Sequence, residues 1–118
     1  MNIDKKENEC YHLFSINEDL TLNSDINALY PMIHQSLESG MHTIVLQFTQ
    51  DSYLSTRTIT VLVNCFEDVK DHEGVLAMIN PNNDILDVLS MIDLDKSVKF
   101  YPSEEKLKKQ IMPVGSLS

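Results

Sequence analysis

Cysteine and histidine are the residues of this chain best suited to metal binding or nucleophilic catalysis, and their spacing supports neither. Cys10 and Cys65 lie far apart and form no CxxC pair, so we interpret them as reduced thiols without a redox role. The four histidines contain no HxxxH or HExxH spacing, which would place two ligands on one helical face. Neither a glycine-rich phosphate loop nor a GxSxG motif occurs. We therefore expect no metal site, no cofactor and no enzymatic activity.

Hydroxyl side chains offer a different chemistry at residues 55–56. Ser55 and Thr56 precede a segment with the apolar spacing of a helix. Either hydroxyl could cap that helix, an interaction that contributes about 1 kcal/mol. Further along, Thr58, Val61 and Cys65 form a second stripe with spacings of three and four. This stripe indicates either an unusually wide buried face or a partly exposed strip that binds a protein partner.

Length and charge limit the function classes. The chain has 118 residues, 42% of them hydrophobic, and a net charge of −9, which predicts one globular domain with a single core. No apolar run approaches the ~18–20 residues of a transmembrane helix. The first ten residues lack the apolar centre of a secretory signal, so we expect a cytoplasmic protein. The negative charge disfavours binding to nucleic acids or to membrane surfaces.

The elements that must position these residues alternate between strands and helices. The order β-β-α-β-α-β-α-β-α predicts an α/β domain, a small mixed β-sheet of four to five strands packed with about four helices. We expect a flexible N-terminus over residues 1–10, the domain over 11–110 and a flexible tail over 111–118. The predicted strands are 11–16, 20–22, 41–48, 75–79 and 98–101.

Polar and glycine residues mark the ends of the predicted helices. The cluster at 23–25 should cap the first helix, and Gly40 should end it in a left-handed conformation. Pro31 lies inside this helix and is expected to kink it. The turn at 80–83 should cap the third helix and Ser103 the fourth.

Five consecutive segments of the chain match the successive motifs of one known family. They are residues 42–48, 54–63 (LSTRTITVLV), 74–81 (GVLAMINP), 83–95 and 100–107. Taken together, and over about 11–109, the chain resembles the STAS domains, the fold of the anti-sigma factor antagonists.

The resemblance implies a regulatory binding module. Such antagonists bind a kinase-like anti-sigma factor, which phosphorylates one serine or threonine at the start of the helix after the third strand. Phosphorylation breaks the complex, and a PP2C-type phosphatase restores it. In the family alignment the modified position falls on Thr56, with Ser55 as the alternative. Ser55 and Thr58 replace the motif's aspartate and glycine, and Arg57 replaces its next serine. These departures leave open a site that is never modified or a kinase of different specificity.

A shifted alignment would place Asp51 and Ser52 on the Asp-Ser pair of the motif. We disfavour it because Ile59, Leu62 and Val63 would then lose their match to the family's helix.

A phosphate at the start of a helix meets free amide hydrogens and the positive end of the dipole. Its disruptive effect should therefore fall on the interface with the partner. The resemblance thus predicts phosphorylation at Thr56 or Ser55 and partner contacts from Ser55, Thr56, Arg57, Thr58, Val61 and Cys65.

Two classes of function follow from this resemblance. The leading hypothesis is a bacterial anti-sigma factor antagonist that acts by partner switching, as a monomer or weak dimer. The alternative is a constitutive STAS subunit of a larger assembly, either a lipid-transport ATP-binding-cassette complex or a stressosome-like scaffold. A nucleotide-binding STAS module and an enzyme of unrelated α/β fold rank lower.

Overall fold

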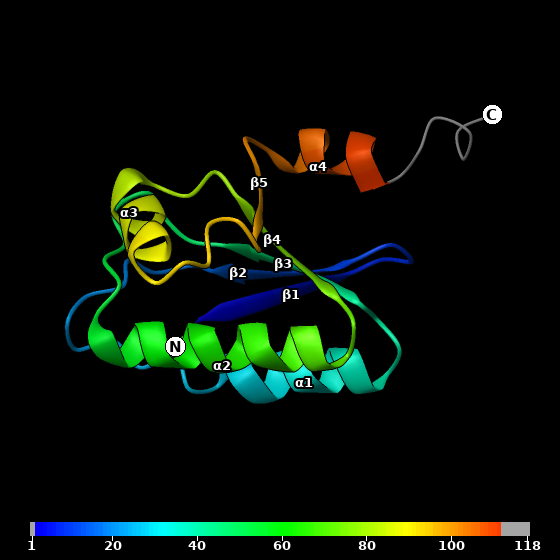
Figure 1. Ribbon diagram of the computed structural model, residues 1–118, viewed down its shortest axis with the longest axis horizontal. Helices are drawn as coiled ribbons and strands as arrows, with labels where there is room; N and C mark the ends of the chain where they lie inside the picture. The colour runs from blue at the N-terminus through cyan, green and yellow to red at the C-terminus, as the bar shows by residue number, and fades with distance from the viewer. Residues whose placement is uncertain (1, 112–118) are drawn as a thin grey trace.

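Five strands form one mixed sheet in the computed structural model, which describes residues 2–111 (Figure 1). Along the sheet the strands keep the order β1-β2-β3-β4-β5. β1 pairs with β2 antiparallel, and all later neighbours pair in parallel. The predicted mixed sheet with four helices is therefore confirmed. The elements are β1 (Ile3–Glu7), β2 (His12–Ile16), α1 (Leu29–Glu38), β3 (Thr43–Gln47), α2 (Thr56–Asp71), β4 (Val75–Ile79), α3 (Asn83–Met91), β5 (Lys99–Tyr101) and α4 (Glu104–Ile111).

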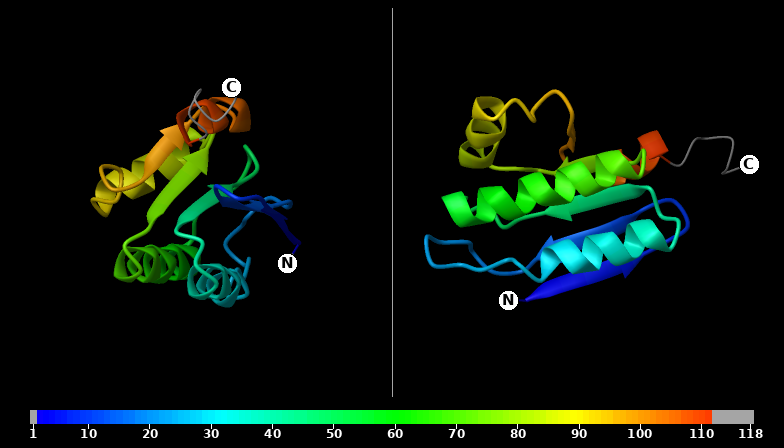
Figure 2. Two further views of the ribbon diagram at one scale, coloured as in Figure 1. Left: turned by 90° about the vertical axis from the view of Figure 1, so that its right-hand side faces the viewer. Right: turned by 60° about the horizontal axis from the view of Figure 1, so that its bottom comes forward.

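Helices α1 and α2 lie side by side on one face of the sheet, and α4 lies on the other (Figure 2). Successive residues of a strand point to opposite faces. On the α1/α2 face, Phe14, Ile44 and Leu46 belong to the main core together with residues of α1, α2 and α3. On the opposite face, Val45 and Leu107 belong to a second, smaller cluster. Among residues 2–111, no helix is both long and apolar enough to cross a membrane.

Two predictions about the N-terminal part of the chain are wrong. Residues 3–7 were expected to be flexible, but they form the edge strand β1, paired from Ile3↔Ile16 to Glu7↔His12. Charged residues are common on edge strands, which face water, and this explains why a polar segment gave no strand signal. Residues 20–22, predicted as a strand, form a loop instead. Of the expected tail at 111–118, Ile111 ends α4, and residues 112–118 lie outside the described residues.

Helix α1 begins later than its sequence suggests. Its N-cap is Ala28, without a side-chain hydrogen bond, while Ser24 and Asp25 accept hydrogen bonds in the preceding turns. Pro31 therefore falls in the first turn, where an amide hydrogen has no partner within the helix, and the expected kink loses its cause. Gly40, at φ 101°, ends the helix as predicted.

One carboxylate ties α4 to the sheet. Glu104 accepts hydrogen bonds from the Tyr11 hydroxyl at 2.6 Å and from Lys6 Nζ at 2.8 Å. Burial, together with this contact, raises the pKa of Tyr11 to about 12. The first strands and the last described helix are thus joined at one point.

Gly74 immediately precedes β4 and leaves no room for a Cβ atom, so we expect Gly74→Ala to lower the free energy of unfolding by about 2 kcal/mol. A Cβ atom at Gly74 would lie 2.5 Å from the carbonyl oxygen of His42. That oxygen accepts the hydrogen bond of Val75 N, at 2.8 Å, so the contact between β3 and β4 would have to shift. Urea unfolding of the variant measures the effect. A loss below about 0.5 kcal/mol would show that the backbone adjusts freely.

Candidate functional site

The start of α2 lies at the sheet edge where the parallel strands end. Ser55 is its N-cap, as predicted, and its Oγ accepts a hydrogen bond from Thr58 N at 3.3 Å. The same hydroxyl donates to Thr58 Oγ1 at 3.2 Å, and the Ser55 side chain is buried. Thr56 is the first helical residue and is exposed. Of the two hydroxyls, the one on Thr56 is open to a second protein.

The second stripe of α2 points into the core. Thr58 and Cys65 are fully buried, and Val61 is nearly so. Burial raises the pKa of the Cys65 thiol to about 12, with a further contribution from the nearby Asp68, so the thiol stays protonated. This arrangement corresponds to the wide buried face, one of the two interpretations of the stripe. The partner-binding strip predicted from Thr58, Val61 and Cys65 is not a surface in this conformation, whereas Arg57 is exposed.

Ser52 has a structural role in the loop before α2. Its hydroxyl accepts a hydrogen bond from Leu20 N at 3.0 Å and contacts Thr49 Oγ1 at 2.8 Å. Tyr53 N donates to Leu20 O at 2.8 Å, so two segments distant in sequence are held together. Ser52 is 1% exposed. The shifted alignment, which would make Ser52 the modified residue, therefore places the modification on an inaccessible hydroxyl.

Asn82 fastens the same loop from the other side. Its Oδ1 accepts from Ile85 N at 2.8 Å and so caps α3, as the 80–83 turn predicted. Its Nδ2 donates to the carbonyl oxygens of Gln50 and Ser52, each at 2.9 Å. Gln50 in turn donates to Asn80 O at 2.6 Å. The sequence indicated the cap but not the two bonds to the loop, because nothing in the 80–83 turn specifies a partner so distant in sequence.

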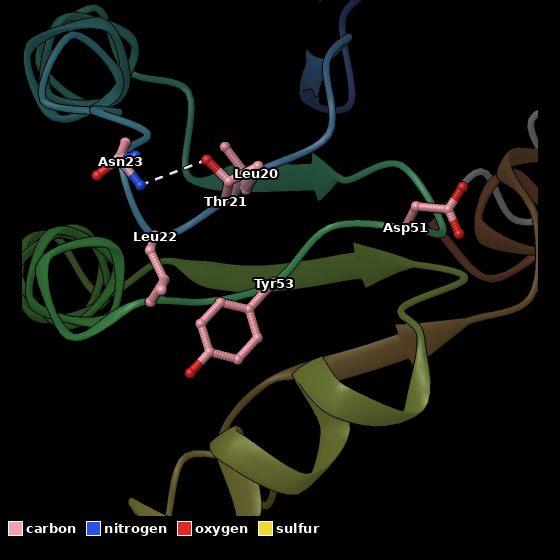
Figure 3. A pocket seen from close by; sticks show the side chains of 6 residues that line it. All are labelled: Leu20, Thr21, Leu22, Asn23, Asp51 and Tyr53. Atoms are coloured by element: carbon pink, nitrogen blue, oxygen red, sulfur yellow. Dashed lines mark hydrogen bonds between the residues drawn. The ribbon is translucent and has the colours of Figure 1, made fainter.

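An open groove of about 530 Å³ lies beside this loop (Figure 3). In Figure 3 the side chains of Leu22 and Tyr53 lie close to each other, and Asp51 stands at the far end. Leu22 is 69% exposed and Tyr53 is 49% exposed. Sequence reasoning missed both, although a leucine between Thr21 and Asn23 was a signal for an exposed apolar residue. The groove is lined by Leu20, Thr21, Leu22, Asn23, Asp51 and Tyr53.

We define the α2 entry face as Leu22, Tyr53, Thr56 and Arg57. It combines exposed apolar surface, a free hydroxyl at a helix start and one cationic side chain. Exposed apolar residues beside polar ones are typical of protein interaction sites. Within residues 2–111, no group of three or more His, Cys, Asp or Glu residues is arranged to hold a metal ion. The arrangement can bind a protein surface and can present a hydroxyl to a kinase.

Comparison with known proteins identifies similar chains. A family model described as the STAS domain matches residues 2–107. A candidate anti-sigma factor antagonist from Thermotoga maritima is 25% identical over 75 residues, which covers 64% of this chain and 66% of that protein. A second relative, from Thermotoga neapolitana, is 31% identical over 65 residues, which covers 55% of this chain and 58% of that protein. The matched segments thus cover less than two thirds of each relative's own length.

Solved structures agree on the fold. The crystal structure of a candidate anti-sigma factor antagonist from T. maritima superimposes with a TM-score of 0.72 at 21% identity, covering 93% of this chain and 94% of that one. Phosphorylated SpoIIAA, a Bacillus cell fate determinant, gives 0.73 at 13% identity and covers 92% and 99%. At these identities the likeness establishes the architecture, and the chemistry must be argued from the residues of this chain.

Proposed function

Because this chain belongs to the STAS domain family, we propose that it is a non-enzymatic regulatory module of the anti-sigma factor antagonist type. It binds a kinase-like regulator through the α2 entry face, and phosphorylation of Thr56 releases that partner. A PP2C-type phosphatase resets the protein. The proposal places this cycle in the cytoplasm.

The observation that carries the proposal is the contrast between two adjacent hydroxyls. Ser55 is buried and bonded to Thr58, whereas Thr56 is exposed at the first position of α2. A kinase needs a reachable hydroxyl, and a helix start tolerates the phosphate because its first amides lack partners within the helix. This favours Thr56 over the alternative Ser55 as the modified residue.

The closeness of Thr56 to Tyr53 in the chain supports the switching step. Thr56 follows Tyr53 by three residues, and in this proposal the partner that binds Leu22 and Tyr53 extends over the Thr56 side chain. A phosphate brings a charge of about −1.5 to −2 at neutral pH. Buried against the partner, that charge opposes binding unless a cation faces it. The modification would therefore break the complex while leaving this domain folded.

Identification of the modified residue and of the partner tests the proposal. The tagged protein is isolated from source cells, its peptides are examined for phosphate, and co-purified proteins are identified by mass spectrometry. We expect phosphate on Thr56 in a fraction of the molecules and a kinase-like regulator with the unmodified form. If Thr56 and Ser55 are never modified and the partners are transporter or stressosome subunits, the constitutive-subunit alternative replaces the proposal.

The apolar part of the α2 entry face should contribute strongly to affinity. We expect Tyr53→Ser to weaken binding to the isolated partner by about tenfold or more, since buried interface aromatics often contribute 1–2 kcal/mol or above. Leu22→Ser should act in the same direction. Calorimetry or surface plasmon resonance measures both.

Met91→Ser is the matched control for these variants. Met91 is 82% exposed but does not line the groove. Its removal should leave the affinity within about twofold. Equal effects of the Met91 and Tyr53 substitutions would mean that the partner binds elsewhere.

A further inference from the structure

A cluster of four titratable side chains joins α1 to α2, away from the α2 entry face. We call it the seam cluster: His34 and Glu38 from α1, and Asp68 and His72 from α2 and its C-cap. His34 Nδ1 lies 2.7 Å from Asp68 Oδ2, and His72 Nε2 lies 2.7 Å from Glu38 Oε2. The two imidazole rings meet edge to face, with centroids 5.9 Å apart. These contacts link helices that are separated in the chain by β3.

Hydrogen-bond geometry fixes the protonation state that suits His72. Its Nδ1 lies 2.9 Å from the backbone oxygen of Asp68, which can only accept a hydrogen bond. Its Nε2 faces the carboxylate of Glu38, which also only accepts when ionised. Both ring nitrogens must therefore carry hydrogen for both bonds to form. Only the imidazolium cation meets that condition, and a neutral ring loses one bond.

The surroundings of the cluster are acidic. Within residues 2–111, the ion pairs of Asp68 and Glu38 are all with histidines. Asp68 is nearly buried, so its carboxylate depends on these partners. Tyr30 stacks on His34, with ring centroids 6.0 Å apart. Further titratable groups of α2 lie near Tyr30 and Asp68, namely Cys65, Glu67 and Asp71.

We propose that the seam cluster is a proton-operated clasp between α1 and α2, closed while His72 is protonated and loosened when it becomes neutral. The clasp goes beyond the proposed function. Thr56 and His72 stand at opposite ends of α2, about 24 Å apart at 1.5 Å per residue. The clasp acts on the packing of α1 against α2.

The direction of the pH dependence follows from the two partners. The hydrogen bond that His72 donates to Glu38 raises the pKa of His72 above its ordinary 6.5. This stabilisation is fully present below 6.5 and is lost as pH rises through the higher pKa of the folded state. The same bond lowers the pKa of Glu38 below 4.5, so that contribution is lost as pH falls through the lowered value. The clasp is therefore strongest between these two limits and opens on the alkaline side.

His12, on β2, gives the stability of the protein the opposite pH dependence. It is buried and bonded to Ser36 Oγ at 2.7 Å, and burial followed by repulsion from Lys5 lowers its pKa. Stability from this group decreases as pH falls from 6.5 through the lowered value. The pH dependence of the stability of the whole protein contains both effects. The test therefore compares the free energy of unfolding of variants with that of the wild type at the same pH.

Urea unfolding of the full chain tests the clasp at about pH 5.5 and about pH 8.5. We expect His72→Gln to be less stable than wild type at the lower pH and the gap to close at the higher one. Glu38→Gln is the informative control, because a glutamine can donate to a neutral His72 ring and so keeps a bond without needing the cation. It should remove the pH dependence of the α1–α2 contact.

Nuclear magnetic resonance of the imidazole nitrogens gives an independent readout in the wild-type protein. His72 should titrate at higher pH than the same residue in the urea-unfolded chain, with both nitrogens protonated at pH 6.5 in most of the folded molecules. The protection of the α1 amides against hydrogen exchange, relative to an unfolded chain at the same pH, should decrease as His72 loses its proton. A gap between wild type and His72→Gln that is equal at both pH values, or a neutral His72 near pH 6.5, would overturn the proposal. If His72→Gln does not fold, the Glu38→Gln profile and the wild-type titration still decide it.

Discussion

Thr56→Glu should weaken binding to the kinase-like partner by about 100-fold or more, whereas Thr56→Ala should leave the affinity within a few-fold. The glutamate places a fixed negative charge at the first position of α2, three residues after Tyr53. A factor of 100 corresponds to about 2.7 kcal/mol. Interfacial charges without a counter-charge commonly have effects of this size. Titration calorimetry with the partner identified by co-purification measures both variants.

The glutamate should not unfold the domain. A carboxylate in the first turn of a helix is stabilised by about 0.3–1 kcal/mol through the helix dipole. The thermal melting temperature of Thr56→Glu should therefore equal or slightly exceed that of the wild type. A weakened complex in a stable variant would locate the effect in the interface.

Thr60→Glu is the matched control for charge. Thr60 is exposed one turn further along α2, so this variant adds the same charge to the same helix. We expect it to change the affinity much less than Thr56→Glu. Equal losses from both variants would indicate general electrostatic repulsion, and no loss from Thr56→Glu would remove Thr56 from the switch.

Asn82→Ala should lower the free energy of unfolding by about 2–3 kcal/mol and also weaken partner binding. The substitution removes the cap of α3 and both donors to the carbonyls of Gln50 and Ser52. The cap alone contributes about 1 kcal/mol. The remainder arises because two carbonyl groups lose their partner while the loop that carries Tyr53 becomes less constrained.

Asn82→Ser separates the two roles of this side chain. A serine hydroxyl can cap α3 but cannot reach both carbonyls of the loop, so it should recover about 1 kcal/mol of the loss. Partner affinity should stay reduced in both variants, and hydrogen exchange should be faster at residues 50–53. If Asn82→Ser restored affinity as well as stability, the loop would not depend on Asn82.

Much of the fold could be predicted from sequence signals that involve only neighbouring residues. The caps at Ser55 and Asn82 each bind the amide three residues ahead, and such contacts depend only on nearby residues. The central strands were predictable because they are apolar on both faces. By contrast, β1 is recognised only when β2 lies beside it, since IDKKE has no apolar pattern of its own. The kink predicted at Pro31 was wrong because the effect of a proline depends on where the helix begins, and α1 begins only two residues before it.

The candidate site was predictable only in part. Thr56 could be located from the family alignment, and its exposure distinguishes it from Ser55 in the structure. The groove could not be found from sequence, because it forms where Leu22 and Tyr53 meet, and 30 residues separate them in the chain. Their contact depends on Ser52 binding Leu20, a polar interaction without a sequence signature. Long-range hydrogen bonds of this kind decide where a surface pocket lies.

The strand order of the sheet has a consequence for how the protein is made. Each strand pairs with the one that precedes it in the chain, so no strand must be inserted between two that are already paired. The antiparallel β1–β2 hairpin spans residues 3–16, so it is the first strand pair of the sheet to be synthesised. Each later strand then adds at the open edge, after the helix that precedes it. The sheet can therefore assemble in the order of its synthesis and exposes one growing edge at a time.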